Sequence, residues 1–168
     1  DYLGESIDDG VVITKYDHSQ GELTNIRIYE AGHPIPDDNS FRATEQAIEL
    51  VCNLSSEDLV LFLISGGGSA LFEKPLVPKD VLEDITKQLL ASGADIVEIN
   101  TIRKRLSAVK GGKFAKLCEP AQVFSVVLSD IIGDPLDMIA SGPAYPDNST
   151  SEQALEIVKK YNISISKE

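Results

Sequence analysis

Residues 59–69 read LVLFLISGGGS, an apolar run that ends at three consecutive glycines. The run has no alternation of apolar and polar residues, which is typical of a strand buried on both faces, as in a parallel sheet covered by helices. A turn directly after such a strand lies at the carboxyl end of the sheet, where open α/β folds bind their ligands. This stretch therefore predicts an α/β fold with a candidate binding loop at the sheet edge.

Strand and helix patterns alternate on both sides of this stretch. Further strands are expected at 10–16, 25–31 and 122–130. Because a short polar turn joins the first two, an antiparallel hairpin or a pair of neighbouring edge strands is expected there. Helices are expected after a cap at Asn39 or Ser40, over 79–92 between Pro78 and Gly93, over about 99–110 with a continuation to Cys118, and from Thr150 to about Tyr161. The alternation predicts a Rossmann-like three-layer sandwich with a mostly parallel sheet.

The composition narrows the class of protein. A chain of 168 residues with 42% hydrophobic residues suits one globular domain, and no apolar run approaches the roughly 18 residues of a membrane helix. The net charge of −12 argues against nucleic acids and anionic membranes as partners. Cys52 and Cys118 are expected to be small buried residues within helices, which fits the cytoplasm. Because the chain opens with Asp1 and ends in ISISKE, a segment suited to a strand, we expect a piece of a longer protein.

The glycine loop, residues Ser65, Gly66, Gly67, Gly68 and Ser69, has three interpretations. A flexible linker is excluded because linkers do not adjoin buried strands. An anion site is favoured by backbone N–H groups that no Cβ shields and by two flanking hydroxyls, whereas a tight turn without a ligand remains the alternative. The loop matches neither the G-x-x-x-x-G-K-[ST] nor the G-x-G-x-x-G nucleotide fingerprint.

Basic residues concentrate in one stretch of this acidic chain. Six of the fifteen lie in RKRLSAVKGGKFAK, residues 103–116, with no acidic residue among them. A solvated helix face is the ordinary explanation of such a run. Here Gly111 and Gly112 interrupt it, which allows close backbone approach, so we expect some of Arg103, Lys104 and Lys110 to bind an anion.

Two further segments contain candidate polar residues. Asp130 ends an expected buried strand and Asp134 follows it, which suits a Mg²⁺ site, although turn hydrogen bonds explain both equally well. His33, in GHPIPDD, lies in a rigid loop and is a candidate for substrate binding or acid–base chemistry, although a lone loop histidine is more often structural.

Four motifs in this order resemble the first domain of the glycerate 2-kinase (MOFRL-type) family. They are GHPIPD, LISGGGSAL, ADIVEINTIRKRLSAVKGGKFA and LSDIIGDPLDMIASGPAYPD, which together fall within residues 32–147. The resemblance implies ATP-dependent phosphorylation of D-glycerate to 2-phosphoglycerate with Mg²⁺, in a cleft between a Rossmann-like α/β domain and a second α/β domain. Residues 1–168 would then be an incomplete first domain. The family's glycine-lysine motif, which precedes residue 1, and its second domain are absent, and Ala144 stands where a Thr is expected, so the fragment alone is expected to be inactive.

We assign hypothetical roles in this reaction to residues of these motifs. Backbone N–H groups of Ser65–Ser69 would bind a phosphate or the glycerate carboxylate. Three basic residues, Arg103, Lys104 and Lys110, would neutralise charge on the transferring phosphoryl group. Asp130 or Asp134 would hold Mg²⁺ or accept the substrate hydroxyl proton.

Three other functions stay open. One is an NAD(P)H-dependent hydroxypyruvate reductase, a label that this family has also attracted, against which the missing dinucleotide fingerprint counts. Another is a hydrolase with Ser69 as its nucleophile, which the missing G-x-S-x-G elbow disfavours. The third is a non-catalytic ligand-binding fragment. A homodimer is one assembly compatible with the sequence.

Overall fold

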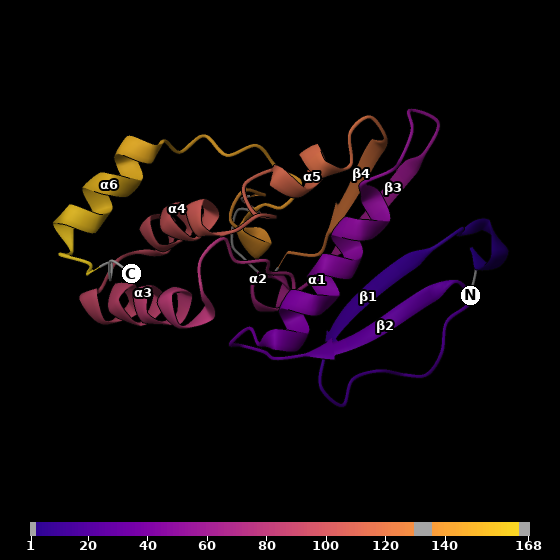
Figure 1. Ribbon diagram of the computed structural model, residues 1–168, viewed down its shortest axis with the longest axis horizontal. Helices are drawn as coiled ribbons and strands as arrows, with labels where there is room; N and C mark the ends of the chain where they lie inside the picture. Colours follow the sequence, from indigo (N-terminus) through magenta and orange to yellow (C-terminus); the bar gives the residue numbers. More distant parts are fainter. Residues whose placement is uncertain (1–2, 130–135, 165–168) are drawn as a thin grey trace.

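The computed structural model describes residues 3–129 and 136–164 (Figure 1). A 3₁₀ turn at Gly4–Ser6 precedes strands β1 (Gly10–Lys15) and β2 (Ile26–Ala31), and helix α1 (Asp38–Val51) follows them. Strand β3 (Leu59–Ile64) leads through the glycine loop into the short helix α2 (Gly68–Leu71). The remaining elements are α3 (Lys79–Ser92), α4 (Ile96–Leu106), α5 (Lys113–Leu117), β4 (Gln122–Val127), the 3₁₀ turn η2 (Ile139–Ser141) and α6 (Ser151–Lys160). The expectation of an α/β fold with mostly parallel strands is confirmed.

The first two strands pair in parallel, with Gly10 opposite Ile26 and Lys15 opposite Ala31. Of the two expected arrangements, the antiparallel hairpin is therefore wrong, whereas a pair of neighbouring edge strands is confirmed within the described residues. Residues 16–25 are long enough, at up to about 3.3 Å per extended residue, to return along a six-residue strand before β2 begins. Length alone therefore does not distinguish a hairpin from a return crossover here.

Strands β3 and β4 also pair in parallel, with Leu59 opposite Gln122 and Ile64 opposite Val127. One face of this pair packs on the core through Phe62 and Ile64. The expectation that both faces are buried is not met in the described residues. The side chains of the opposite face are 46% to 72% exposed; they are Leu59, Leu61, Leu63, Phe124, Val126 and Leu128.

Caps set the helix boundaries. Helix α1 begins after Asp37, whose carboxylate accepts from the Ser40 N–H at 2.9 Å, so Asp37 is the cap in place of Asn39 or Ser40. Helix α3 spans the expected 79–92 and ends at left-handed Gly93, and α6 has the expected capping box of Thr150 and Gln153. Helix α4 begins earlier and ends earlier than expected because Asp95 caps it and Ser107 turns to an extended conformation.

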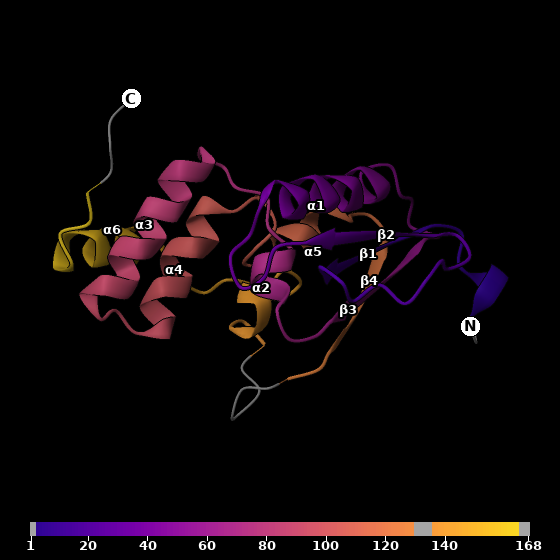
Figure 2. The same cartoon turned by 90° about the horizontal axis from the view of Figure 1, so that it is seen from below.

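Two apolar clusters hold the molecule together. One lies between α3, α4 and α6 and centres on Leu89, Ile102 and Ile157. The other lies between α1, α5 and the strands, where the rings of Phe62, Phe72 and Phe114 meet with centroids 4.8 to 5.4 Å apart. Figure 2 shows α1 covering one side of the strands and the three-helix group standing apart at the other end of the molecule.

The cysteines occupy the C-caps of two helices, and only one matches its expectation. Cys118, after α5, is fully buried, whereas Cys52, after α1, is exposed. Both thiols are free. The expected final strand falls partly on residues 165–168, which lie outside the described residues.

Candidate functional site

The glycine loop leaves the carboxyl end of β3 and turns at once into α2. Gly67 is left-handed, with φ of +88°, and a Cβ at this position would stand 3.0 Å from Cδ2 of the His33 ring. Two motifs that are far apart in the sequence are therefore in contact here. Within the part of the chain that the structure describes, the N–H groups of Gly66 and Gly67 have no hydrogen-bond acceptor. These N–H groups are available to an anion.

A cluster of charged side chains in the protein interior supports the glycine loop. The Lys110 ammonium donates to the carbonyl oxygens of Ser69 at 2.9 Å and Phe72 at 3.1 Å, and the Arg103 guanidinium donates to the same Ser69 oxygen at 3.3 Å. Lys110 is fully buried and lies 3.3 Å from the carboxylate of Glu73, which is only 1% exposed. The three charged side chains sum to one positive charge beneath the glycine loop. This charge favours an anion on the loop.

Burial affects the basic groups of this cluster. It lowers the pKa of Lys110 to about 8, a shift that the nearby Glu73 carboxylate opposes. Burial also lowers the pKa of Arg103, although an arginine stays charged at any ordinary pH. In this conformation Lys110 and Arg103 both donate to the Ser69 carbonyl oxygen. Both side chains therefore hold the loop.

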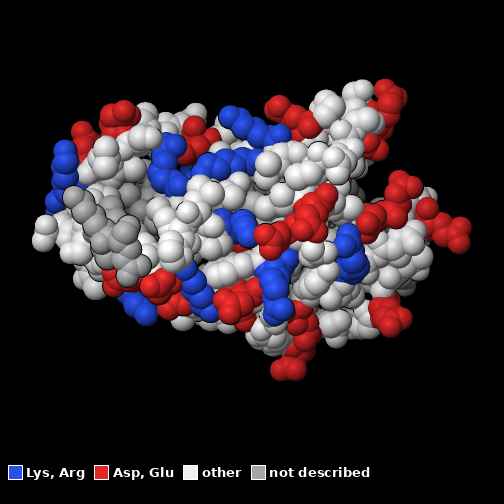
Figure 3. All heavy atoms as spheres, viewed as in Figure 1, with Lys and Arg blue, Asp and Glu red and all other residues white. Residues whose placement is uncertain are grey.

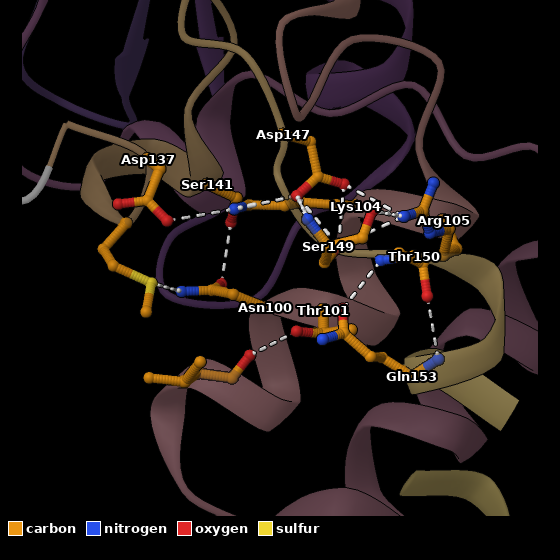
Figure 4. A network of polar contacts seen from close by, with 12 residues as sticks. Asn100, Thr101, Lys104, Arg105, Asp137, Ser141, Asp147, Ser149, Thr150 and Gln153 are labelled. Atoms are coloured by element: carbon orange, nitrogen blue, oxygen red, sulfur yellow. Dashed lines mark hydrogen bonds and ion pairs between the residues drawn. The ribbon is translucent and has the colours of Figure 1, made fainter. Parts of the chain in front are cut away.

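Lys104 lies in a second polar network, between α4 and residues 137–150 (Figure 4). Its ammonium is 3.4 Å from the Asp137 carboxylate and 3.5 Å from that of Asp147, and its side chain is 6% exposed. Asp147 also pairs with Arg105 at 3.4 Å. Burial would raise the pKa of Asp147, but hydrogen bonds from Ser149 and the two nearby cations lower it overall.

A groove of about 510 Å³ opens beside this network. Lys104 and Thr101 of α4 form one wall, Ile157 and Lys160 of α6 form another, and Asp137 lies at its edge. Its size is in the range of small-molecule sites. The groove mixes apolar and charged side chains and is open to solvent. Of the three basic candidates Arg103, Lys104 and Lys110, Lys104 is the one that lines it.

The SGP triplet (residues 141–143) joins the two networks. The Ser141 hydroxyl donates to Oδ1 of Asn100 at 2.9 Å and lies 3.3 Å from the hydroxyl of Ser69. The N–H groups of Gly111 and Gly112 donate to the carbonyl oxygens of Ser141 at 3.0 Å and Gly142 at 2.7 Å. The two glycines that interrupt the basic stretch therefore bind the backbone of the SGP triplet through main-chain hydrogen bonds. All four motifs meet around the glycine loop.

The six basic residues of 103–116 differ in what they contact. The Lys113 ammonium donates to the carbonyls of Lys104 and Ser107, both at 2.6 Å, which satisfies the end of α4. Arg105 donates to the Ser149 carbonyl, and Lys116 is exposed. Figure 3 shows basic side chains gathered where α4 and α5 lie in Figure 1, whereas the end near the N-terminus is mainly acidic.

The predicted metal ligands, Asp130 and Asp134, lie outside the described residues. Among the residues that the structure does describe, no three His, Cys, Asp or Glu side chains stand together as a metal site. Asp137 and Asp147, two of the acidic residues that line the groove, both face the Lys104 ammonium, so a cationic group already lies between them. Mg²⁺ binding therefore stays a prediction that rests on Asp130 and Asp134.

The sequence alone did not single out three residues of this site. Glu73 has no motif around it, and only its burial beside Lys110 reveals it. Asn100 lies inside a motif that drew attention for its basic residues. Ser141 had a signal, the SGP triplet, but no chemistry was assigned to it.

The fold and the loop define an α/β domain with a glycine loop at the carboxyl end of a parallel strand. The chain belongs to the family described as "Domain of unknown function (DUF4147)", whose pattern matches residues 1–168. Among its relatives, the D-glycerate 2-kinase of Thermotoga maritima is 56% identical over 166 residues, which are 98% of this chain and 40% of that protein. A crystal structure of glycerate kinase from Thermotoga maritima superposes with a TM-score of 0.96 at 56% identity, over 98% of this chain and 40% of that one.

A different name appears on another relative. A protein of Agrobacterium vitis that is named as a hydroxypyruvate reductase is 46% identical over 156 residues, or 92% of this chain and 40% of its own length. The chain thus spans about two fifths of the length of the curated relatives it matches. In the described residues, no helix is both long enough and apolar enough to cross a membrane.

Proposed function

We propose that this chain forms one wall of the active site of an ATP-dependent kinase that converts D-glycerate to 2-phosphoglycerate. The observation that carries the proposal is that the N–H groups of Gly66 and Gly67 have no acceptor among residues 3–129 and 136–164, backed by the net positive cluster of Lys110, Arg103 and Glu73. Both glycerate and ATP are oxyanions that such a loop can hold. The names of the Thermotoga maritima relatives, D-glycerate 2-kinase and glycerate kinase, point the same way.

In this reaction the 2-hydroxyl of glycerate attacks the γ-phosphorus of ATP, ADP leaves, and the hydroxyl proton is lost. Phosphoryl transfer depends mainly on positioning and on neutralising charge. The N–H groups of Gly66 and Gly67 would orient one oxyanion, and Lys104, at the groove, would neutralise charge on the phosphoryl group. His33 would fix the loop by its contact with Gly67. Lys110 and Arg103 would keep the Ser69 carbonyl turned inward so that the N–H groups face outward.

Several parts of the proposal fall outside the described residues. Asp130 or Asp134 would hold Mg²⁺, which supplies charge neutralisation on phosphate when bound. A second domain would supply the other wall of the cleft. The proposal also includes the cytoplasm as the compartment and a homodimer as one possible assembly.

A coupled kinase assay on the full-length protein tests the proposal. The expected result is ADP release that requires D-glycerate, with 2-phosphoglycerate as the product identified by NMR. Phosphorylation at neither hydroxyl would end the kinase interpretation. The loop itself is tested by Gly67→Ala, which adds a Cβ against the His33 ring, with Gly93→Ala as a control because Gly93 is also left-handed but its Cβ would meet nothing.

Hydroxypyruvate reductase activity is tested in a parallel assay because relatives carry that name. Oxidation of NADH or NADPH with hydroxypyruvate, followed by absorbance, would favour that alternative over the kinase. If neither assay gives turnover, calorimetric titration with ATP·Mg and with glycerate distinguishes a ligand-binding protein from one without a ligand in this class.

A further inference from the structure

The turn that contains the SGP triplet is strained. Three successive residues adopt left-handed φ angles, +52° at Ala140, +61° at Ser141 and +62° at Gly142. Only the third is glycine, and residues with a Cβ adopt this conformation at an energetic cost. Such a conformation persists when the surrounding contacts determine it, and it is common at functional sites. Ser141 is also fully buried, so its conformation is not set by solvent.

Two neighbouring segments, the basic stretch and the glycine loop, hold this turn in place. Gly111 and Gly112, themselves left-handed, donate their N–H groups to the carbonyls of Ser141 and Gly142. On the other side, the Ala140 methyl packs against the glycine loop so closely that a Cβ placed on Gly68 would lie only 3.0 Å from it. The turn is therefore clamped between the basic segment and the glycine loop.

The result of this clamp is the placement of one hydroxyl. Ser141 Oγ lies 2.9 Å from Oδ1 of Asn100 and 3.3 Å from Oγ of Ser69. The amide nitrogen of Asn100 lies 3.3 Å from the sulfur of Met138, which fits the Asn100 oxygen facing Ser141. Because Ser141 has one proton and gives it to Asn100, the Ser69 hydroxyl donates to Ser141. The lone pairs of Ser69 then remain to accept a hydrogen bond from a ligand.

We propose that Ser141 is a positioning residue, which uses the left-handed turn to fix the Ser69 hydroxyl as a hydrogen-bond acceptor at the edge of the glycine loop. The proposal rests on the proposed function for its consequence in catalysis. In that setting the N–H groups of Gly66 and Gly67 receive an oxyanion, and Ser69 accepts a proton donor of the same ligand. A hydroxy acid offers both groups, whereas a phosphate without a proton offers only the first.

Amide hydrogen exchange on the full-length protein tests the positioning without any ligand. The reporters are the N–H groups of Gly68, Ala70 and Leu71, which close the loop by donating to Ser65 and Gly67 carbonyls. Ser141→Ala should speed their exchange about tenfold, the effect of one lost buried hydrogen bond, relative to amides of α3. Ser141→Gly relieves the strained φ and still removes the hydroxyl, so it should speed loop exchange equally while raising the melting temperature above that of Ser141→Ala.

The control is Asn162→Gly, which relieves another left-handed residue, with φ of +49°, far from the loop in the sequence. It should leave loop exchange unchanged. If Ser141→Ala and Ser141→Gly both leave exchange at Gly68, Ala70 and Leu71 unchanged, the positioning role is wrong whatever the protein's activity is. If Ser141→Ala does not fold, Ser141→Gly alone decides.

A kinetic double-mutant cycle tests the catalytic consequence separately. Ser69→Ala and Ser141→Ala should each lower kcat/KM for the hydroxy acid about tenfold, and the double variant should be no worse than either single one. Additive losses would overturn the coupling between the two hydroxyls. Absence of turnover in the unmodified protein would instead reject the proposed function and leave the exchange result to decide the positioning role.

Discussion

Lys110 and Lys104 lie six residues apart in the same basic stretch, yet the structure places them in opposite situations. Lys110 is fully buried under the glycine loop, faces Glu73 and donates to two carbonyls. Lys104 is also shielded, but it stands at the wall of an open groove between two aspartates, one of them 40% exposed. The comparison shows that one charge run can contain a lysine that organises the glycine loop and a lysine that lines a groove open to solvent.

The largest effect is expected where the charge is most deeply buried. Lys110→Met leaves the Glu73 carboxylate buried without its paired cation, which should lower the free energy of unfolding by about 3 to 5 kcal/mol. Lys104→Met should cost less because its partner Asp137 reaches solvent. Urea unfolding at pH 7 measures both. Adding Glu73→Leu to Lys110→Met should recover most of the loss, and an equal loss for the two lysine variants would contradict the contrast drawn between them.

The next prediction separates backbone strain from ligand binding. Gly67→Ala and Gly93→Ala each place a Cβ on a left-handed residue, at φ of +88° and +75°, so each should lower stability by about 1 to 2 kcal/mol. Only Gly67→Ala also meets the His33 ring. We therefore expect it alone to abolish binding of inorganic phosphate, followed by NMR shifts of the Gly66 amide. Retained binding in Gly67→Ala would show that the loop is a structural turn.

Lys104 is tested by kinetics. Lys104→Ala in the full-length protein should lower glycerate-dependent turnover at least about tenfold, or roughly 1.4 kcal/mol, with the fold intact by circular dichroism. Lys116→Ala is the matched control because Lys116 belongs to the same stretch and is exposed. Unchanged kinetics in Lys104→Ala would remove this residue from the candidate site.

The smallest effect is the acid dependence of the Lys104 network. Since the pKa of Asp147 is lowered in the fold, its ionised form stabilises the protein at pH values above the ordinary carboxyl pKa of about 4. That stabilisation is lost as the pH falls through the lowered pKa. Asp147→Asn should therefore be less stable than the unmodified protein at pH 7, and the difference should shrink toward pH 2. Thermal unfolding across this range measures it, and a constant difference would contradict the assignment.

Much of the fold was accessible from local pattern. Helix α3 has the predicted bounds because its stripe, Pro78 and Gly93 all act locally, and Thr150 with Gln153 gave the start of α6 for the same reason. The parallel direction of the β1–β2 pair was not accessible, because the ten residues between the two strands allow either a hairpin or a return crossover. The exposure of one face of β3 and β4 was not accessible either. Apolar side chains occur on both faces of these strands, so the sequence does not indicate which face the rest of the chain covers.

The sequence by itself determined the α/β alternation, the glycine loop at the end of a strand and the concentration of basic residues, since each is a matter of residue type and spacing along the chain. Only the tertiary structure decided that Lys110 anchors the loop, that Glu73 balances it, and that Ser141 reaches Ser69. Such roles depend on contacts between residues that are far apart in the sequence. Arg103 lies 34 positions from Ser69, and Ser141 lies 72 positions from it. Burial and hydrogen-bond direction arise only when such distant segments pack together, and neither is encoded by any short stretch.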